Sequence, residues 1–133
     1  MSDASSASCD HHAMGRTVLI VDDHHGFRGF AARLLRAGGF EVIGEAKDGS
    51  SALMAARRLQ PELVLLDVLL PDMSGFAVAE ELAGDSSGPQ IVLISSRSAS
   101  ELGAALEESR ADGFIAKSEL TVEAVVALAD GGS

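Results

Sequence analysis

The amino-acid sequence predicts a single α/β domain with a doubly wound (βα)5 architecture, in which helices cover both faces of a parallel β-sheet. Runs of four or five aliphatic residues recur along the chain, and such runs are typical of strands buried on both faces. The segments between them are long enough for helices, as right-handed βαβ crossovers require. The length of 133 residues and the apolar content of 47% suit one domain with its own core.

The first elements follow from local patterns. A strand is expected over about 17–22, where four aliphatic residues run into two acids. A helix is expected over 25–37, because apolar residues recur there at helical spacing and a glycine pair suited to a C-cap follows. A second strand is expected over about 41–46, and an Asp-Gly turn leads into a helix over about 50–59.

The second half of the chain repeats this alternation, with a proline before the next strand and a Pro- and Gly-containing loop before the next helix. The remaining elements are expected as a strand at about 62–67, a helix at 75–83, a strand at 90–95, a helix at 99–109, a strand at 113–116 and a helix at 120–129. We expect residues 1–15 to be a flexible leader, residues 16–130 to be the folded domain, and residues 131–133 to be a tail.

Composition excludes several functional classes. No apolar stretch approaches the ~20 residues that a membrane span needs, and the N-terminus lacks the apolar core of a secretion signal. The single cysteine, Cys9, cannot form an internal disulfide, so we expect a cytoplasmic protein. The net charge of −10 would repel phosphates, and Trp and Tyr are absent, so direct binding of nucleic acid by this chain is not expected.

Polar residues capable of phosphate chemistry follow four of the predicted strands. They are Asp22 and Asp23 after the first strand, Asp67 after the third, Ser95 after the fourth and Lys117 after the fifth. Because the carboxyl ends of parallel strands meet at one edge of the sheet, we expect these side chains to converge there.

Three neighbouring carboxylates repel one another unless a cation balances them, and oxygen ligands of this kind suit Mg²⁺. We therefore expect Asp23 and Asp67 to be direct Mg²⁺ ligands, with Asp22 farther from the ion. Asp67 is the candidate nucleophile for a phosphoryl group, Lys117 would neutralise its charge, and Ser95 would donate a hydrogen bond to it. Taken alone, the Asp-Asp pair could instead be a helix N-cap with a solvated neighbour.

The motifs that carry these residues resemble those of a response-regulator receiver domain, and the resemblance covers about residues 16–130. They are Val18-Leu19-Ile20-Val21-Asp22-Asp23-His24, Leu65 through Gly75, Ile94-Ser95 and Gly113-Phe114-Ile115-Ala116-Lys117. The resemblance implies a flavodoxin-like sheet with strand order 2-1-3-4-5.

The same resemblance implies the roles of the site residues. It implies Asp67 as phosphoacceptor, a Mg²⁺ site formed by Asp22, Asp23, Asp67 and the backbone carbonyl of Leu69, Ser95 and Phe114 as switch residues, and Lys117 as the lysine that contacts the phosphate. No enzymatic activity is expected beyond the domain's own phosphotransfer and autodephosphorylation. Residues 45–49 and His24 favour the LuxR/NarL-type subgroup of receivers, which often precede DNA-binding domains.

The resemblance also implies partners. A sensor histidine kinase or a phosphotransfer protein would supply the phosphoryl group, and the surface formed by 99–109, 113–116 and 120–129 would bind a downstream protein or a second copy of the chain. We favour a stand-alone receiver; the alternative is a receiver fragment of a LuxR/NarL-type transcription factor.

Four positions depart from the usual family pattern or influence the phosphorylated state. Ser118 stands where many relatives have proline, which puts the usual cis peptide in doubt, and Phe114 lacks a tyrosine's hydroxyl. Leu69 and Arg97 occupy positions that influence how long the phosphate survives, and we expect a phosphorylated state that is not especially short-lived.

Two rival hypotheses fit less well. A haloacid-dehalogenase-like, Mg²⁺-dependent phosphatase would need a second acid two residues after its nucleophile, where this chain has Leu69. A flavodoxin-like carrier would need a phosphate-binding loop after the first strand, where Asp22 and Asp23 would repel an anion.

Overall fold

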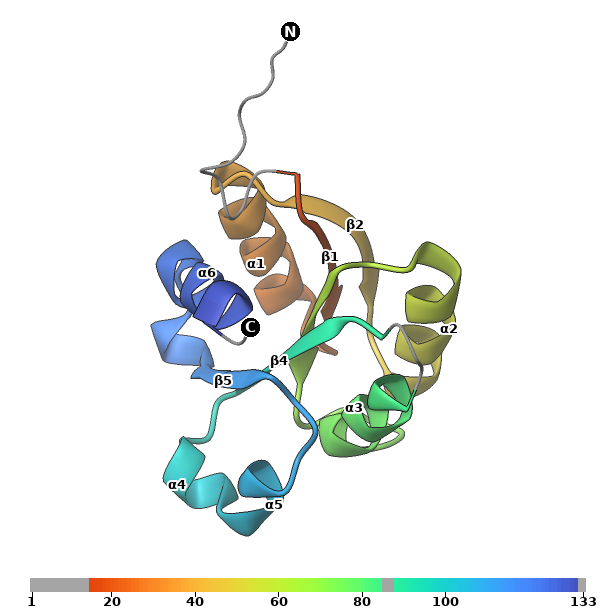
Figure 1. The fold of residues 1–133 in the computed structure, drawn as a ribbon, viewed down its shortest axis with the longest axis vertical. Helices are drawn as coiled ribbons and strands as arrows, with labels where there is room; N and C mark the ends of the chain where they lie inside the picture. Colours follow the sequence, from red (N-terminus) through yellow and green to blue (C-terminus); the bar gives the residue numbers. More distant parts are fainter. Residues whose placement is uncertain (1–14, 85–87, 132–133) are drawn as a thin grey trace, which may run out of the picture.

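A five-stranded parallel sheet with strand order β2-β1-β3-β4-β5 forms the centre of the domain (Figure 1). The structure is a computed structural model that describes residues 15–84 and 88–131. The strands are β1 (Thr17–Val21), β2 (Glu41–Ala46), β3 (Leu63–Asp67), β4 (Gln90–Ser95) and β5 (Gly113–Ala116). The predicted α/β class and the strand order implied by the resemblance are therefore confirmed.

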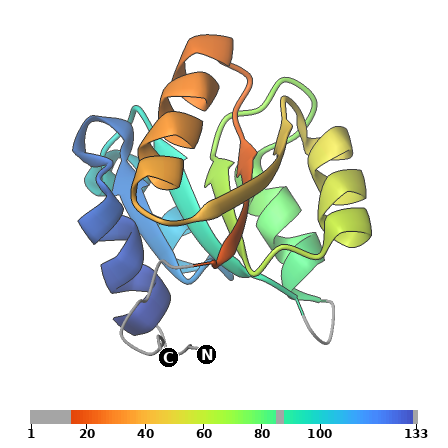
Figure 2. The same cartoon turned by 90° about the horizontal axis from the view of Figure 1, so that it is seen from above.

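Helices cover both faces of this sheet, α1 and α6 on one side and α2 and α3 on the other (Figure 2). The helices are α1 (His25–Ala37), α2 (Gly49–Leu59), α3 (Gly75–Ala83), α4 (Ala99–Leu102), α5 (Ala104–Glu107) and α6 (Val122–Gly131), with a 3₁₀ turn, η2 (Lys117–Glu119), before α6. Each connection between consecutive parallel strands thus contains a helix.

Alternating side chains of the strands feed two separate cores. In β1, Val18 and Ile20 pack with α1 and α6, whereas Leu19 and Val21 pack with α2 and α3. All four are completely buried, as are the aliphatic residues of β3. This burial on both faces is the reason that the strands appear as continuous aliphatic runs in the sequence.

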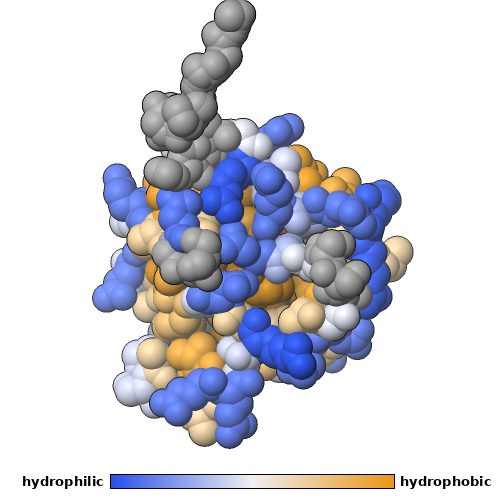
Figure 3. Space-filling model, viewed as in Figure 1, coloured by the Kyte–Doolittle hydropathy of each residue, from blue (hydrophilic) through white to orange (hydrophobic). Residues whose placement is uncertain are grey.

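The predicted helix over 99–109 was wrong in its continuity and its end. The segment forms two short helices, α4 and α5, separated by Gly103, and the second ends at Glu107. Gly103 has φ +58° and ψ −134°, a backbone conformation that is essentially restricted to glycine and that no helix contains. Figure 3 shows apolar and hydrophilic side chains side by side over α4 and α5, where the partly buried Leu102 and Leu106 pack against the core.

The last helix begins later than expected, at residue 122 rather than 120. The hydroxyl of Thr121 accepts a hydrogen bond from the Ala124 N–H at 3.0 Å and so caps the first turn. Leu120, by contrast, is buried outside the helix. The described residues contain no cis peptide bond, so the bond before Ser118 is trans.

The boundaries of the predicted leader and tail are not tested. Residues 1–14 and 132–133 lie outside the described residues, so the flexible leader and the short tail stay predictions. Within the described part of the chain, no helix combines the length and the apolar character needed to cross a membrane. The predicted cytoplasmic location also stays a prediction.

Candidate functional site: an acidic cluster at the carboxyl edge of the sheet

The strand order brings the predicted site residues to one edge of the sheet. Asp22 follows β1, Asp67 ends β3, Ser95 ends β4, and Lys117 follows β5. β1, β3, β4 and β5 are consecutive neighbours in the sheet, and chain connections diverge from the β1–β3 pair toward opposite edges. Open α/β sheets bind ligands at the carboxyl ends of the strands where the strand order reverses.

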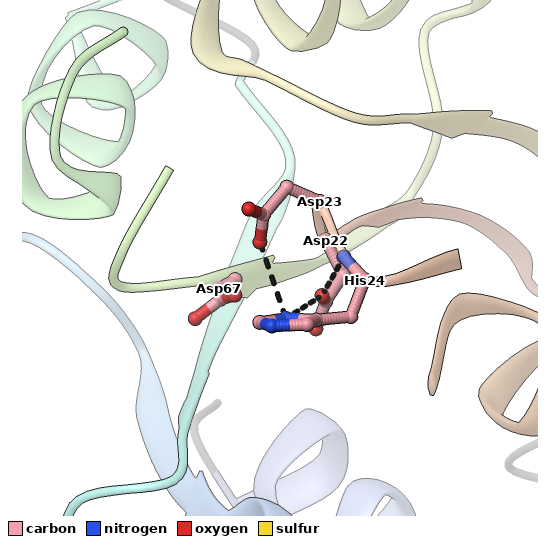
Figure 4. Close-up of side chains that lie close together, drawn as sticks. All are labelled: Asp22, Asp23, His24 and Asp67. Carbon is pink, nitrogen blue, oxygen red and sulfur yellow. Dashed lines mark hydrogen bonds and ion pairs between the residues drawn. The ribbon is translucent and has the colours of Figure 1, made fainter. Parts of the chain in front are cut away.

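Four side chains with metal-ligating atoms form a cluster at this point. One ligand atom from each of Asp22, Asp23, His24 and Asp67 lies within 4.8 Å of the others (Figure 4). Asp22 is fully buried and Asp67 is 3% exposed, whereas Asp23 and His24 are exposed. The cluster therefore has a buried base and an open, solvent-facing side.

Asp22 is held in place but is not fully satisfied. Its Oδ1 accepts a hydrogen bond of 2.8 Å from the backbone N–H of His24. Its Oδ2 lies 2.7 Å from Lys117 Nζ as an ion pair, yet no donor is aligned to make a hydrogen bond to it. Among the described residues, Asp22 Oδ2 is the one buried side-chain polar atom in this condition.

This unsatisfied oxygen and the neighbouring carboxylates fit a divalent cation. Hard cations such as Mg²⁺ prefer carboxylate oxygens and keep several waters, which the open side of the cluster allows. The donor set of Asp22, Asp23 and Asp67 is therefore consistent with the predicted Mg²⁺ site.

The Asp67 carboxylate is in an environment that disfavours its charge. Burial, followed by the negative charge of Asp22, raises the pKa of Asp67 above its usual value. The Leu69 N–H, 3.2 Å from Oδ1, and Lys117 Nζ, 3.4 Å from Oδ2, partly oppose this shift. A cation bound beside Asp67 would favour its ionised form.

Lys117 bridges the two buried acids. Its ammonium contacts Asp22 at 2.7 Å and Asp67 at 3.4 Å, and its side chain is 15% exposed. The ammonium also lies 4.6 Å from the centroid of the Phe27 ring, in a cation–π arrangement. Phe27 follows the acid pair by one helical turn, which is the sequence signal that could have indicated its place beside the site.

The loop after Asp67 is fixed by contacts that the sequence analysis missed. The Asp72 carboxylate accepts hydrogen bonds from the first two N–H groups of α2, at 2.7 and 2.9 Å, and these bonds lower the pKa of Asp72. At the other end of the loop, a Cβ on Gly75 would collide with the Asp67 carbonyl oxygen. The loop that carries Leu69 is thus anchored to both α2 and β3.

The predicted switch residues, Ser95 and Phe114, are not part of the acidic cluster. Ser95 is buried, and its hydroxyl accepts a hydrogen bond of 3.0 Å from the Arg97 N–H; in the described residues no hydrogen bond joins it to Asp67. Phe114 is half-buried and packs against the core on the α2 and α3 side. The side chain of Leu69 is not buried in the core, since the residue is 55% exposed.

Residues 18–129 match the family model described as the response regulator receiver domain. The chain belongs to this family. The match includes every strand after the first residue of β1 and every residue of the acidic cluster.

Two curated relatives illustrate the relation of this receiver domain to longer proteins. TcrX of Mycobacterium tuberculosis, described as a transcriptional regulatory protein, is 38% identical over 110 residues, which are 83% of this chain and 46% of TcrX. The DNA-binding response regulator MtrA of Mycolicibacterium smegmatis is 40% identical over 106 residues, which are 78% of this chain and 45% of MtrA. The chain spans about half the length of these relatives.

Solved receiver structures are similar as well. The signal receiver domain of NarL from Mycobacterium tuberculosis aligns with a TM-score of 0.78 and 32% identity, covering 89% of this chain and 98% of that one. A LuxR-family two-component response regulator from Aurantimonas sp. SI85-9A1 aligns with a TM-score of 0.78 and 26% identity, covering 88% of this chain and 86% of that one. The similarity to NarL- and LuxR-family receivers that the sequence predicted is thereby confirmed.

Membership of the family has general consequences. A receiver domain implies a histidine kinase as partner and is typically not a conventional enzyme. The acidic cluster of this receiver domain is of the kind that holds Mg²⁺ in receivers. The complex of CheX with CheY, BeF₃ and Mg²⁺ from Borrelia burgdorferi has a TM-score of 0.77 at 23% identity, a similarity of fold alone.

Proposed function

We propose that this receiver domain accepts a phosphoryl group on Asp67 from the phosphohistidine of a sensor histidine kinase or of a phosphotransfer protein. The observation that carries the proposal is the setting of the Asp67 carboxylate, which is buried beside Asp22 with the Lys117 ammonium 3.4 Å from its Oδ2. Carboxylates of this kind attack phosphorus and form aspartyl phosphates.

In the proposed reaction an ionised Asp67 oxygen attacks phosphorus, and the bond from phosphorus to the donor breaks with its electron pair leaving on the donor. The Leu69 N–H and Lys117 favour the ionised carboxylate against the effects of burial and of Asp22. Asp22, Asp23, Asp67 and the Leu69 carbonyl would hold Mg²⁺. When bound, this ion supplies positive charge that favours the carboxylate and the transferring group.

Lys117 and Ser95 would stabilise the product. The Lys117 ammonium, now 2.7 Å from Asp22, can turn toward an oxygen of the phosphoryl group and neutralise part of its charge. The Ser95 hydroxyl, which accepts from the Arg97 N–H, remains free to donate its own proton to a second oxygen.

Displacement of Ser95 would couple the site to a distant surface. Phosphorylation adds about −1.5 to −2 charge units and three strong acceptors, and Ser95 drawn toward them would vacate space for the Phe114 ring. The surface formed by α4, α5, β5 and α6 would then change its preference for a downstream protein or for a second copy of the chain. A near-complete shift of the equilibrium between the two states of this surface needs roughly 5 kcal/mol of differential stabilisation. Several charge-assisted hydrogen bonds to the phosphoryl group can provide that amount.

The proposal limits chemistry at the site to the domain's own phosphotransfer and autodephosphorylation. The rival phosphatase mechanism has no support here, because Leu69 occupies the position at which that mechanism needs a second acid.

The phosphorylated receiver could act on its targets in two ways. A stand-alone receiver would act through a bound protein partner. The alternative, a receiver portion of a DNA-binding regulator, is supported by the names of TcrX and MtrA and by their length, of which this chain matches less than half.

The test is phosphorylation of the full chain by acetyl phosphate with and without Mg²⁺, followed by intact-mass measurement. The wild-type protein should gain one phosphoryl group only when Mg²⁺ is present, and Asp67→Asn should gain none. Asp112→Asn is the matched control, because Asp112 is a carboxylate near the opposite end of the sheet and should leave the adduct unchanged.

An adduct that persists in Asp67→Asn would place the phosphoacceptor elsewhere. A wild-type protein that forms no adduct, even when quenched within seconds, would contradict the proposed function.

A further inference from the structure

The imidazole of His24 lies within the acidic cluster, in contact with two of its carboxylates, and the proposed phosphotransfer does not use it. Its Nδ1 is 3.3 Å from Asp22 Oδ1 and 3.2 Å from Asp23 Oδ1 (Figure 4). The backbone N–H of His24 donates to the same Asp22 oxygen at 2.8 Å, which fixes the residue against the cluster. The side chain is 72% exposed, so this part of the cluster faces solvent.

The two distances from His24 Nδ1 match those between adjacent ligands of one ion. Transition-metal ions bind imidazole nitrogen and carboxylate oxygen at about 2.0–2.2 Å, so adjacent ligand atoms lie about 2.8 to 3.6 Å apart in octahedral or tetrahedral geometry. The two separations from His24 Nδ1 fall inside this range. These two separations are therefore compatible with one ion shared by His24, Asp22 and Asp23.

A second, independent feature also indicates a cation. Asp22 Oδ2 is buried and accepts no hydrogen bond, although it belongs to a carboxylate that is fully buried. The Lys117 ammonium lies 2.7 Å from this oxygen as an ion pair, so the oxygen has a positive charge beside it but no hydrogen bond. One ammonium does not balance three neighbouring carboxylates, which is the charge pattern that favours a further cation.

The nitrogen makes this site chemically different from one built of oxygen alone. Mg²⁺ prefers oxygen ligands, whereas imidazole suits the later first-row ions, whose affinities for mixed nitrogen and oxygen sites rise from Mn²⁺ toward Cu²⁺. We propose that His24 Nδ1 is a ligand of the cation bound by Asp22, Asp23 and Asp67, and that it shifts the metal preference of this receiver domain from Mg²⁺ toward first-row transition-metal ions.

This proposal rests on the proposed function only in placing a divalent cation among the three acids; it does not need Asp67 to be phosphorylated. Mg²⁺ would still bind through the oxygens, and His24 would act as the residue that determines specificity among metals.

The neighbouring residue His25 provides a matched control. It is also an exposed histidine, but its Nδ1 lies 3.4 Å from an Arg28 guanidinium nitrogen rather than in the cluster. Cys9, His11 and His12 could bind transition metals on their own. All proteins in the test therefore carry Cys9→Ser, His11→Asn and His12→Asn in the full chain.

The experiment measures Mn²⁺ affinity from the electron paramagnetic resonance signal of the free ion, and Mg²⁺ affinity by competition with Mn²⁺. His24→Asn should weaken Mn²⁺ binding at least about tenfold, the scale seen when a partner of a metal site is removed. Mg²⁺ affinity should change by no more than about twofold, since its oxygen ligands remain. His25→Asn should change neither affinity.

Direct spectroscopy makes the test independent of variant folding. Electron spin-echo modulation of bound Mn²⁺ should show coupling to one ¹⁴N nucleus in the protein that retains His24 and in His25→Asn, and none in His24→Asn. A merely structural role of His24 would not produce this signal.

Two results would overturn the proposal, and they separate it from the proposed function. If Mn²⁺ binds without ¹⁴N coupling and His24→Asn does not change the ratio of the two affinities, only the nitrogen ligand is excluded. If Mn²⁺ binding survives in both Asp23→Asn and Asp67→Asn, no cation occupies the acidic cluster, and the Mg²⁺-dependent function fails as well.

Discussion

The two ends of the same parallel sheet are built on opposite electrostatic principles. At the amino end, polar groups are paired: Thr17 and Glu62 exchange hydrogen bonds of 3.0 and 2.9 Å, and the Asp112 carboxylate accepts from the Ile91 N–H at 2.7 Å. At the carboxyl end, Asp22 and Asp67 are buried as neighbouring like charges, with only Lys117 between them. At the amino end the named polar groups are hydrogen-bonded in pairs, whereas at the carboxyl end two buried carboxylates share one ammonium.

Among the groups compared, unfavourable electrostatics are therefore confined to the carboxyl end of the sheet. The strands and both cores are common to the two ends, so the contrast arises from the residues that follow the strands. Burial of like charges raises the pKa of Asp67 and leaves an oxygen of Asp22 without a hydrogen bond. The unfavourable electrostatics are local, and a bound cation would relieve them.

Among the substitutions considered, Gly75→Ala is expected to change the free energy of unfolding most, because it disrupts the packing beside Asp67 at the carboxyl end of the sheet. The added Cβ would collide with the Asp67 carbonyl and crowd the Val68 backbone, which cannot move as a flexible side chain can. We expect a loss of about 3 kcal/mol in the free energy of unfolding, measured by urea denaturation.

Gly26→Ala is the control for this prediction. It is a helical glycine of α1 whose added Cβ would meet nothing within 4 Å. The free energy of unfolding of this variant should rise by about 0.5 kcal/mol, because alanine restricts the conformations of the unfolded chain. Equal destabilisation of both variants would show that the close packing beside Asp67 is not the cause.

A smaller effect of opposite sign is expected from Asp67→Asn, which removes one of the two buried like charges. Because the pKa of Asp67 is raised in the folded state, its ionisation disfavours folding at pH 7. The variant should therefore be more stable than wild type by about 1 kcal/mol in the absence of divalent ions. Thermal unfolding at pH 7 with a chelator present would measure this gain.

The pH dependence of this gain follows from the same shift. The folded state binds the Asp67 proton more tightly than the unfolded state does, so the advantage of Asp67→Asn is complete above the raised pKa. It should disappear as the pH falls through that pKa toward the usual value of 3.8. A variant that is less stable than wild type at pH 7 without metal would contradict the prediction.

The smallest effect is expected at the amino end, where Asp112→Ala removes an acceptor from the Ile91 N–H. Because Asp112 is exposed, water can take its place as acceptor for the Ile91 N–H, so the free energy of unfolding should fall by only about 0.5 kcal/mol. Saturating Mg²⁺ should leave this loss unchanged, whereas it should reverse the sign of the Asp67→Asn difference. A Mg²⁺-dependent effect of Asp112→Ala would show that the two ends are coupled.

Elements governed by local patterns were predictable from the sequence. The helix over 25–37 matches α1 at both ends, and the strand over 41–46 matches β2, because periodicity and turn residues lie within each segment. The predicted helix over 99–109 was wrong in its continuity, because apolar spacing indicates which residues face the core but not whether Gly103 adopts a positive φ.

The meeting of the site residues at one edge of the sheet was also predictable from the sequence. Aliphatic runs predict strands, and parallel strands bring their carboxyl ends to one edge, so the meeting of Asp22, Asp67 and Lys117 follows from topology alone. The arrangement within the cluster does not follow. The contact of Lys117 with Phe27 and the turn of the His24 ring toward the acids depend on side-chain rotamers and on the path of a loop. Those are set by packing among residues distant in the chain, which local sequence patterns do not encode.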